Sequence, residues 1–360
     1  MRSSVAVSTL ILGAALASAP SGAHAETVRT VKAELAGPDE AKFSVENLLG
    51  SMRIAPGSGS SVEVVATVHA ETPELAEAVR IERVAEGGGT TLRVRYPYER
   101  VSTFRYREPS DDGFSFGWSS SESYEYDGHR VRVNRGHGTA LYADVEVRVP
   151  SVAIHGSFST LLGLIDADSL KGELRFRVES ADLRLRRLDG STTLTGSSGD
   201  IRARDVKGTW SSDFSSGDCD IAGFEGDVLS IRTTSGDATL RSVKARRADF
   251  ESTSGDLRLN DADLQELQAE TSSGDVDFDA TGLGLRDVRI RTASGDVSLR
   301  LPDKLNFDVD ADQSSGDMDV RFSDGEEVSH RDRLVGYRRG TGGARIHVRT
   351  SSGDLTVSPS

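Results

Sequence analysis

The sequence predicts an all-β protein: a single-stranded parallel β-solenoid (β-helix) with turns of about 18–21 residues and an N-terminal β cap. Three observations predict it. A Gly-Asp pair returns at a nearly constant spacing, the residues after each pair alternate between apolar and polar, and no helical pattern separates the pairs. Subtracting successive Asp positions gives steps of 18, 19, 19, 19, 21, 21 and 37 residues. A fixed period of this length is typical of stacked repeats.

Each pair belongs to a Ser-Gly-Asp corner, first seen at Ser198-Gly199-Asp200. Gly adopts a positive φ at low cost, and Asp or Ser accepts hydrogen bonds from nearby backbone N–H groups. We therefore predict a structural turn ladder and assign it no catalytic, cofactor or metal role. The ladder comprises Gly199, Asp200, Gly217, Asp218, Gly236, Asp237, Gly255, Asp256, Gly274, Asp275, Gly295, Asp296, Gly316, Asp317, Gly353 and Asp354.

The strands on either side of the corners should stack in parallel. A period near 19 residues is too short for a strand plus a crossover helix, so each strand pairs with its equivalent in the next coil, about 4.8 Å away. An antiparallel meander would need turn signals every 8–12 residues or so, and the near-identical corners argue against it.

Residues 1–25 resemble a secretory signal peptide, which predicts export. Arg2 precedes an apolar run from Val5 to Ala17, and small residues end at Ala23-His24-Ala25. The run is too short to span a bilayer, and no other long apolar run follows, so no transmembrane segment remains after signal removal. The single cysteine, Cys219, falls in an inward-facing column, where we expect a small core residue. Export without disulfides suggests a bacterial envelope protein, either periplasmic or secreted to the cell surface.

Residues 26–150 are predicted to form the β cap, which covers the open end of the solenoid. Within it, Asn47–Ser51 resembles a divergent corner, and Pro73–Ala78 should form one or two helical turns capped by Thr72.

An insertion over residues 98–138 interrupts the cap and is crowded with aromatic residues. One interpretation is a hairpin whose aromatic side chains pack on the solenoid end, and a second is a binding loop for a sugar or a partner protein. The third is a disordered segment. The candidate partner-binding residues are Tyr106, Phe114, Phe116, Trp118, Tyr124 and Tyr126.

Residues 151–360 are predicted to form the solenoid repeat domain. Two degenerate coils, at Leu162–Ile165 and Ser180–Leu183, precede the regular ones. The charged segment between Asp324 and Gly343 accounts for the 37-residue step. We interpret it as a solvated loop, with a basic ligand site as the second interpretation.

Composition and motifs limit the possible functions. A net charge of −14 argues against nucleic acid as a partner. One carboxylate per corner is too few for a calcium site, which needs 6–8 oxygen ligands. Outward acid pairs such as Asp218 with Asp220, Asp275 with Asp277 and Asp317 with Asp319 could serve a polysaccharide-processing enzyme. The second acid is missing from the other corners, however, which favours a structural role, and no nucleophile elbow or P-loop is present.

Finally, the repeat itself resembles a known family. Thr271–Phe278 and Thr350–Val357, behind a signal peptide and the Val147–Pro150 segment, resemble the bacterial putative-adhesin β-repeat family, domain of unknown function 4097. The resemblance implies a β-solenoid with an adhesin-like role and brings no catalytic residues. We therefore expect an exported, non-catalytic binding or scaffolding protein of the cell envelope, without cofactors, whose partner is an envelope protein or glycan. The alternative is an envelope polysaccharide-processing enzyme on a β-helix.

Overall fold

The computed structural model describes residues 26–36, 42–86, 88–106, 121–330 and 333–360, so the signal-peptide prediction lies outside the described residues. These residues form strands and one short helix, and the all-β parallel solenoid is confirmed. The chain divides into two compact units, residues 1–182 and 183–360, which are described separately below. No helix in the described ranges is long and apolar enough to cross a membrane.

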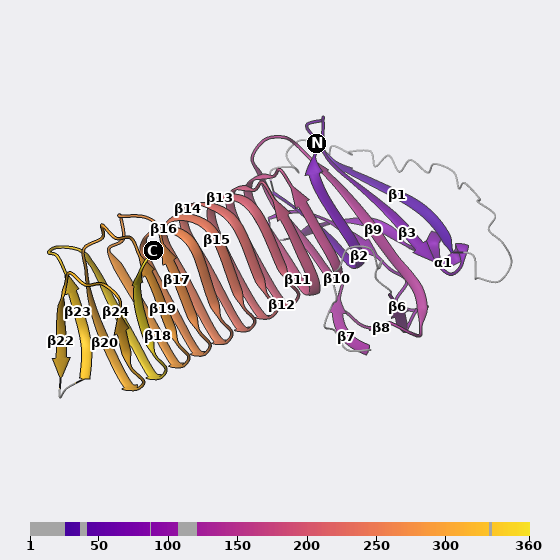
Figure 1. The fold of residues 1–360 in the computed structure, drawn as a ribbon. Helices are drawn as coiled ribbons and strands as arrows, with labels where there is room; N and C mark the ends of the chain where they lie inside the picture. Colours follow the sequence, from indigo (N-terminus) through magenta and orange to yellow (C-terminus); the bar gives the residue numbers. More distant parts are fainter. Residues whose placement is uncertain (1–25, 37–41, 87, 107–120, 331–332) are drawn as a thin grey trace. The chain divides into compact units, whose positions relative to one another are not determined.

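The first unit contains the predicted cap and the first coils (Figure 1). Strand β3 pairs antiparallel with β1 and β9, whereas β2 pairs in parallel with β5, β9 and β10. The elements are β1 (Thr27–Leu35), β2 (Phe43–Pro56), β3 (Val62–Ala70), α1 (Pro73–Ala78), β4 (Arg80–Glu86), β5 (Gly89–Arg95), β6 (Thr103–Arg105), β7 (Ser121–Tyr126), β8 (His129–Asn134), β9 (Thr139–Val149), β10 (Ile154–Asp168) and β11 (Lys171–Arg186), the last of which runs into the second unit.

Regular stacking already begins inside this unit. Gly50, in the predicted divergent corner, has a φ of +119° and lies opposite Gly163 in the parallel pairing of β2 with β10. A Cβ added to Gly163 would lie 2.1 Å from the Gly50 carbonyl oxygen, so the two corners are stacked directly on each other. The corner predicted at residues 47–51 is thus confirmed.

The short helix α1 is also confirmed, together with its cap. The Thr72 side chain accepts a hydrogen bond from the Leu75 N–H, and Pro73 occupies the first turn. Beyond its last turn, Arg29 Nη1 donates to the carbonyl oxygens of Ala76 at 2.9 Å and Val79 at 3.0 Å. Arg29 thus joins carbonyls at and just beyond the helix end, where the Ala76 oxygen also accepts the Val79 N–H at 3.4 Å.

The second unit is a row of stacked coils whose strands repeat in chain order up to β18 (Figure 1). Strands β13 to β16 each run from one Ser-Gly-Asp corner to the next, so the looser return that we expected is itself mostly β structure. The strands are β12 (Asp189–Ser198), β13 (Ile201–Ser216), β14 (Cys219–Ser235), β15 (Ala238–Ser254), β16 (Leu257–Ser273), β17 (Val276–Ala280), β18 (Asp287–Ser294), β19 (Val297–Leu301), β20 (Phe307–Ser315), β21 (Met318–Val320), β22 (Glu326–His330), β23 (Arg333–Arg339), β24 (Ala344–Ser352) and β25 (Leu355–Pro359).

In the core of the second unit, equivalent residues of successive coils stack directly on one another and form columns. Leu240, for example, lies between Ile221 and Leu259, and all three side chains are buried. Cys219 belongs to a second such column, in which it lies next to Ala238. It is 6% exposed, and burial raises the pKa of its thiol. The prediction that Cys219 is a small core residue is therefore confirmed.

The end of the stack differs from our expectation. Strand β24 inserts between β18 and β20, pairing in parallel with both, although β20 precedes it in the chain. Strand β23 then pairs antiparallel with β20, and β22 with β23. The segment predicted to be a solvated loop is thus a hairpin that covers the last coil. Its anchor is Tyr337, 2% exposed, whose hydroxyl donates to the Phe322 carbonyl oxygen at 2.9 Å.

Candidate functional site

The Ser-Gly-Asp corners form a continuous hydrogen-bonded ladder. In each step one Asp carboxylate accepts the backbone N–H of the Asp in the neighbouring coil. Asp256 Oδ1, for example, accepts from the Asp275 N–H at 2.9 Å, and Asp275 Oδ1 accepts from the Asp296 N–H at 2.8 Å. After Asp296 the ladder passes to Asp354 and only then to Asp317, because β24 and β25 lie inside the stack.

The glycines of the ladder allow the corners to touch. Their φ angles are positive, from +103° at Gly316 to +154° at Gly274 and Gly295. A Cβ on Gly274 would lie 2.1 Å from the Gly255 carbonyl oxygen, far inside contact distance. Both the φ angle and the close approach therefore require Gly, as expected for a structural turn.

The ladder carboxylates do not converge on a point. Each corner supplies one carboxylate, and in every corner before the last one in the ladder, at Asp317, an oxygen of that carboxylate already accepts a backbone N–H. Within the described ranges, no group of three or more His, Cys, Asp or Glu side chains could hold a metal ion. The ladder has the arrangement of a turn motif, and independence from calcium stays a prediction.

Two of the outward acids that an enzyme could use, Asp220 and Asp319, are engaged in ion pairs on the surface. Asp220 Oδ1 lies 2.7 Å from Arg241 Nη1, and Asp319 Oδ2 lies 2.9 Å from Arg321 Nε. All four side chains are about half exposed or more. Neither acid lines the hollows that the described residues form on the faces of the coils.

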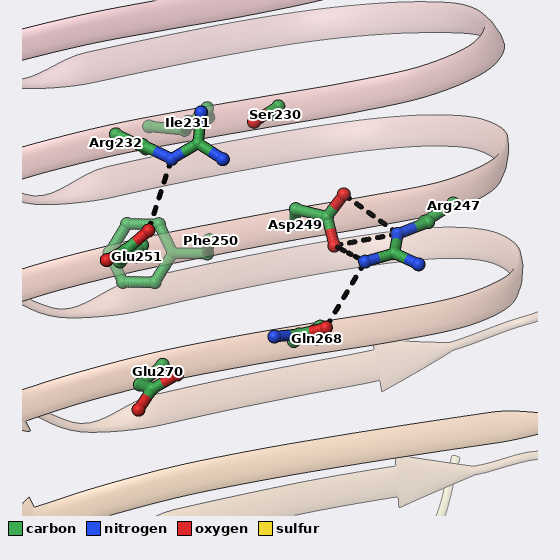
Figure 2. Close-up of a pocket in the computed structure, with 9 residues that line it drawn as sticks. All are labelled: Ser230, Ile231, Arg232, Arg247, Asp249, Phe250, Glu251, Gln268 and Glu270. Atoms are coloured by element: carbon green, nitrogen blue, oxygen red, sulfur yellow. Dashed lines mark hydrogen bonds and ion pairs between the residues drawn. The ribbon is translucent and has the colours of Figure 1, made fainter.

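A second outward side of the coils is distinct from the one that carries Asp220 and Asp319. The second halves of β13–β16 form it together with β18, β24 and β20, and we call it the long-arm face. Its side chains align in rows with one residue per coil. A shallow hollow of about 110 Å³ lies on this face, and Figure 2 shows the residues that line it. Across it Arg232 contacts Glu251 at 3.1 Å, and Arg247 contacts Asp249 at 2.7 Å and Gln268 at 3.2 Å.

A larger hollow of about 460 Å³ lies where β18, β24 and β20 meet the hairpin β22–β23. Two contacts join polar side chains in its lining: Asp308 contacts Arg338 at 3.2 Å, and Asp310 contacts His347 at 3.2 Å. Strand pairing aligns Asp287, Arg345, Asp308 and Arg338 in one row of alternating charge. The long-arm face is thus densely charged but largely neutralised by its own pairs.

Among the aromatic residues of the insertion that the structure describes, several are buried in the first unit. Tyr106 is 3% exposed and packs edge-on against Tyr142, and Tyr126 is 6% exposed and donates its hydroxyl to the Val94 carbonyl oxygen at 3.0 Å. Tyr124 is half-buried, and its hydroxyl donates to Glu122. Buried Tyr106 and Tyr126 thus pack within the cap, against Tyr142 and Val94.

Phe114, Phe116 and Trp118 lie outside the described residues. Partner binding by the aromatic set as a whole stays a prediction.

One polar cluster was missed in the sequence. In the first unit Asp144 accepts hydrogen bonds from the Ser51 hydroxyl at 2.7 Å and the Ser51 N–H at 2.9 Å, and contacts His69 Nε2 at 3.2 Å. The hydrogen bond to Asp144 raises the pKa of His69 despite its partial burial. Burial opposes ionisation of Asp144, but its bonds to His69 and Ser51 outweigh burial and lower its pKa.

This cluster is structural and not a catalytic triad. The carboxylate lies in the middle, so the imidazole cannot take a proton from the serine. Asp144 instead has the role of a ladder Asp. Its carboxylate accepts the backbone N–H of the residue that follows a corner Gly, here Ser51 after Gly50. The signal that could have found it is Ser51, placed directly after the divergent corner.

The chain resembles one protein family and several solved structures. A family model described as Toastrack DUF4097 matches residues 143–358, and no curated protein matches the chain. A putative lipid binding protein from Parabacteroides distasonis ATCC 8503 is 12% identical over 91% of this chain and 96% of that chain, with a TM-score of 0.39. A putative adhesin from the same organism is 10% identical over 91% and 97%, with a TM-score of 0.39. A putative cell adhesion protein from Clostridium sporogenes ATCC 15579 is 9% identical over 93% and 100%, with a TM-score of 0.23. The three names describe adhesion or lipid binding, and none describes an enzyme.

Proposed function

The chain belongs to the toastrack DUF4097 family, and from this premise we propose that it is an exported, non-catalytic β-solenoid acting as an adhesin-like binding or scaffolding protein of the bacterial cell envelope. The expected partner is an envelope protein or glycan. Export rests on the signal-peptide pattern of residues 1–25, and the absence of a second cysteine fits a protein stabilised by stacking alone.

The observation that carries the proposal is the register of the long-arm face. Parallel pairing from β13 to β20 holds one outward side chain per coil in each row, at the strand spacing of about 4.8 Å. Such a face is rigid before it meets a partner, which lowers the entropy that binding must overcome. An extended, repetitive partner could contact several coils at once.

The hollows on this face favour surface binding over catalysis. The hollow of about 110 Å³ is smaller than ordinary small-molecule pockets, which occupy about 300–1,000 Å³. The hollow of about 460 Å³ falls in that range, but paired charges line it where such pockets are mostly apolar. A polysaccharide-processing enzyme would need two carboxylates facing each other across the sugar, about 5–10 Å apart. Asp220 and Asp319 are instead exposed and bound to arginines.

The test uses the mature chain, residues 26–360, immobilised and exposed to purified envelope fractions, namely peptidoglycan and outer-membrane vesicles. Capture of one of them, with no release of soluble sugar, is the expected result. Release of sugar fragments would support the enzyme alternative, and failure to capture either fraction would contradict the proposal.

Charge-swapped variants locate the binding surface. Arg232→Glu with Glu251→Arg reverses an ion pair on the long-arm face while keeping it paired. The matched control is Asp220→Arg with Arg241→Asp, which reverses a similar exposed pair on the opposite side of the coils. We expect the first double variant to lose capture and the second to keep it; the reverse pattern would move the binding surface to the other side.

A further inference from the structure

The last strand of the stack, β22, has an open edge. Among the described strands it pairs only with β23, and in Figure 1 it is the outermost strand of the second unit. All five of its residues are exposed, and Val328 is one of four large hydrophobic side chains exposed in the described residues, at 44%. An unpaired strand edge presents a row of N–H and C=O groups that can pair with another chain.

The sequence of β22 is complementary to itself in one antiparallel register. With Val328 facing Val328 of a second copy, Glu326 faces His330 and Glu327 faces Ser329. Each acidic residue thus meets a basic or neutral partner, twice over because of the two-fold axis. A register centred one residue earlier would place Glu327 against Glu327 of the second copy, which is unfavourable for like charges directly opposite.

From this complementarity we propose that two copies of the chain associate through β22, which pairs antiparallel with itself about a two-fold axis at Val328. Such an interface is isologous, so it closes at the dimer and leaves no open edge for a third copy. Five residues a side are far fewer than the roughly 20–30 of a standard interface, so the dimer forms at high concentration and dissociates on dilution. Association joins two long-arm faces, and Val328 itself lines the larger hollow where such a face meets the hairpin β22–β23.

Glu326 and Glu327 could instead serve only to keep other strands away, as charges on edge strands often do. The two interpretations differ in a measurable way. An edge protected by charge stays monomeric at any concentration, whereas the register above brings chosen pairs of residues within covalent reach.

Disulfide trapping tests the register. Directly facing residues of antiparallel strands have Cα atoms about 4.5–5.5 Å apart, which suits a disulfide. The variant Val328→Cys should therefore form a covalent dimer under mild oxidation of a concentrated sample. The matched control is Val152→Cys, since Val152 is an exposed valine in the first unit, at 66%. The parent chain controls for Cys219, which is buried.

A mixture of two further variants fixes the pairing. Glu327→Cys mixed with Ser329→Cys should cross-link, whereas Glu327→Cys alone should not. Two copies of residue 327 would lie two residues apart along the strands, about 8 Å between Cα atoms and beyond disulfide reach.

Sedimentation velocity supplies a readout without cysteine chemistry. The parent chain should show a concentration-dependent dimer that Val328→Lys removes, with both chains equally folded by circular dichroism. The proposal is wrong if Val328→Cys cross-links no faster than Val152→Cys, if Glu327→Cys cross-links as readily alone as in the mixture, or if Val328→Lys leaves a dimer intact.

Discussion

Replacing Gly274 by Ala should damage the stack more than its small size suggests. Gly274 combines a φ of +154° with direct contact to the coil below. An added Cβ would lie 2.1 Å from the Gly255 carbonyl oxygen and 2.7 Å from its carbon. Both contacts are to backbone, which cannot rotate away as a side chain could, so the two coils must separate locally.

The magnitude follows from the bonds at this corner. The unfavourable φ costs about 1–3 kcal/mol. Separation of the coils removes three hydrogen bonds: Gly255 N–H to the Ser273 oxygen at 3.0 Å, Asp275 N–H to Asp256 Oδ1 at 2.9 Å, and Leu257 N–H to the Asp275 oxygen at 2.9 Å. At about 1 kcal/mol each, the total loss is about 4–6 kcal/mol.

The control is Gly342→Ala, in the same unit. Gly342 also has a positive φ, +69°, but a Cβ there would meet no heavy atom within 4 Å. Its expected cost is the conformational part alone, about 1–2 kcal/mol. The difference between the two variants isolates the stacking contact.

The assay is urea denaturation of the mature chain and both variants, followed by circular dichroism. Stacked repeats and a second unit allow partial unfolding, so the comparison uses midpoints and hydrogen exchange of the amides between β15 and β16. If Gly274→Ala unfolds at the same midpoint as Gly342→Ala, the coils are not packed backbone to backbone and the reasoning fails.

Four further predictions concern the ladder and its surroundings. Asp275→Ala should lower the free energy of unfolding by about 1–3 kcal/mol in urea titrations, because the Asp296 N–H loses its acceptor, whereas Asp275→Asn keeps an oxygen there and should cost less. The folded-state pKa of His69 is raised, so protonation of its imidazole stabilises the folded protein. This stabilisation is fully present below the unfolded pKa of about 6.5 and is lost as pH rises through the folded pKa. The parent should therefore lose melting temperature relative to His69→Gln as pH rises above about 6.5, and parallel pH profiles would contradict this. Thr271→Val should raise the melting temperature or leave it unchanged, because the buried Thr271 hydroxyl makes no hydrogen bond within the described residues; a clear loss would reveal a partner. Chelator and millimolar calcium should give the same melting midpoint, and a rise of several degrees with calcium would assign the ladder a metal.

Much of the second unit could be predicted from the sequence because its determinants are local and repeated. Each corner carries its own Gly and Asp, and each following strand its own alternation, so eight copies support one interpretation. The corner at Gly50 was also recognisable, although its acid is Asp144, 93 residues away from Ser51. No period connects these two residues, and for that reason the cluster with His69 was missed.

The hairpin β22–β23 was misinterpreted because its surface composition is that of a loop. Every residue of β22 is exposed, and in β23 only Gly336 and Tyr337 are buried. Such a strand shows little of the alternation that marks a half-buried strand. The anchoring contact of Tyr337 with the Phe322 carbonyl is a single tertiary interaction that composition does not reveal.

The spatial order of β18, β24 and β20 could not be predicted from the sequence of any single repeat. This order also has a consequence for folding. Strand β24 carries the same apolar alternation as its neighbours, and its pattern would suit the end of the stack as well as the interior. Because β24 pairs with both β18 and β20, β20 has no parallel neighbour until the later segment arrives. During synthesis β18 therefore stays an open edge while β20–β23 emerge. The corner ladder shows the same order, since Asp354 accepts from Asp317 and donates to Asp296. We therefore expect the last parallel coil to be completed only when β24 pairs with both β18 and β20, the strand that also carries the covering hairpin.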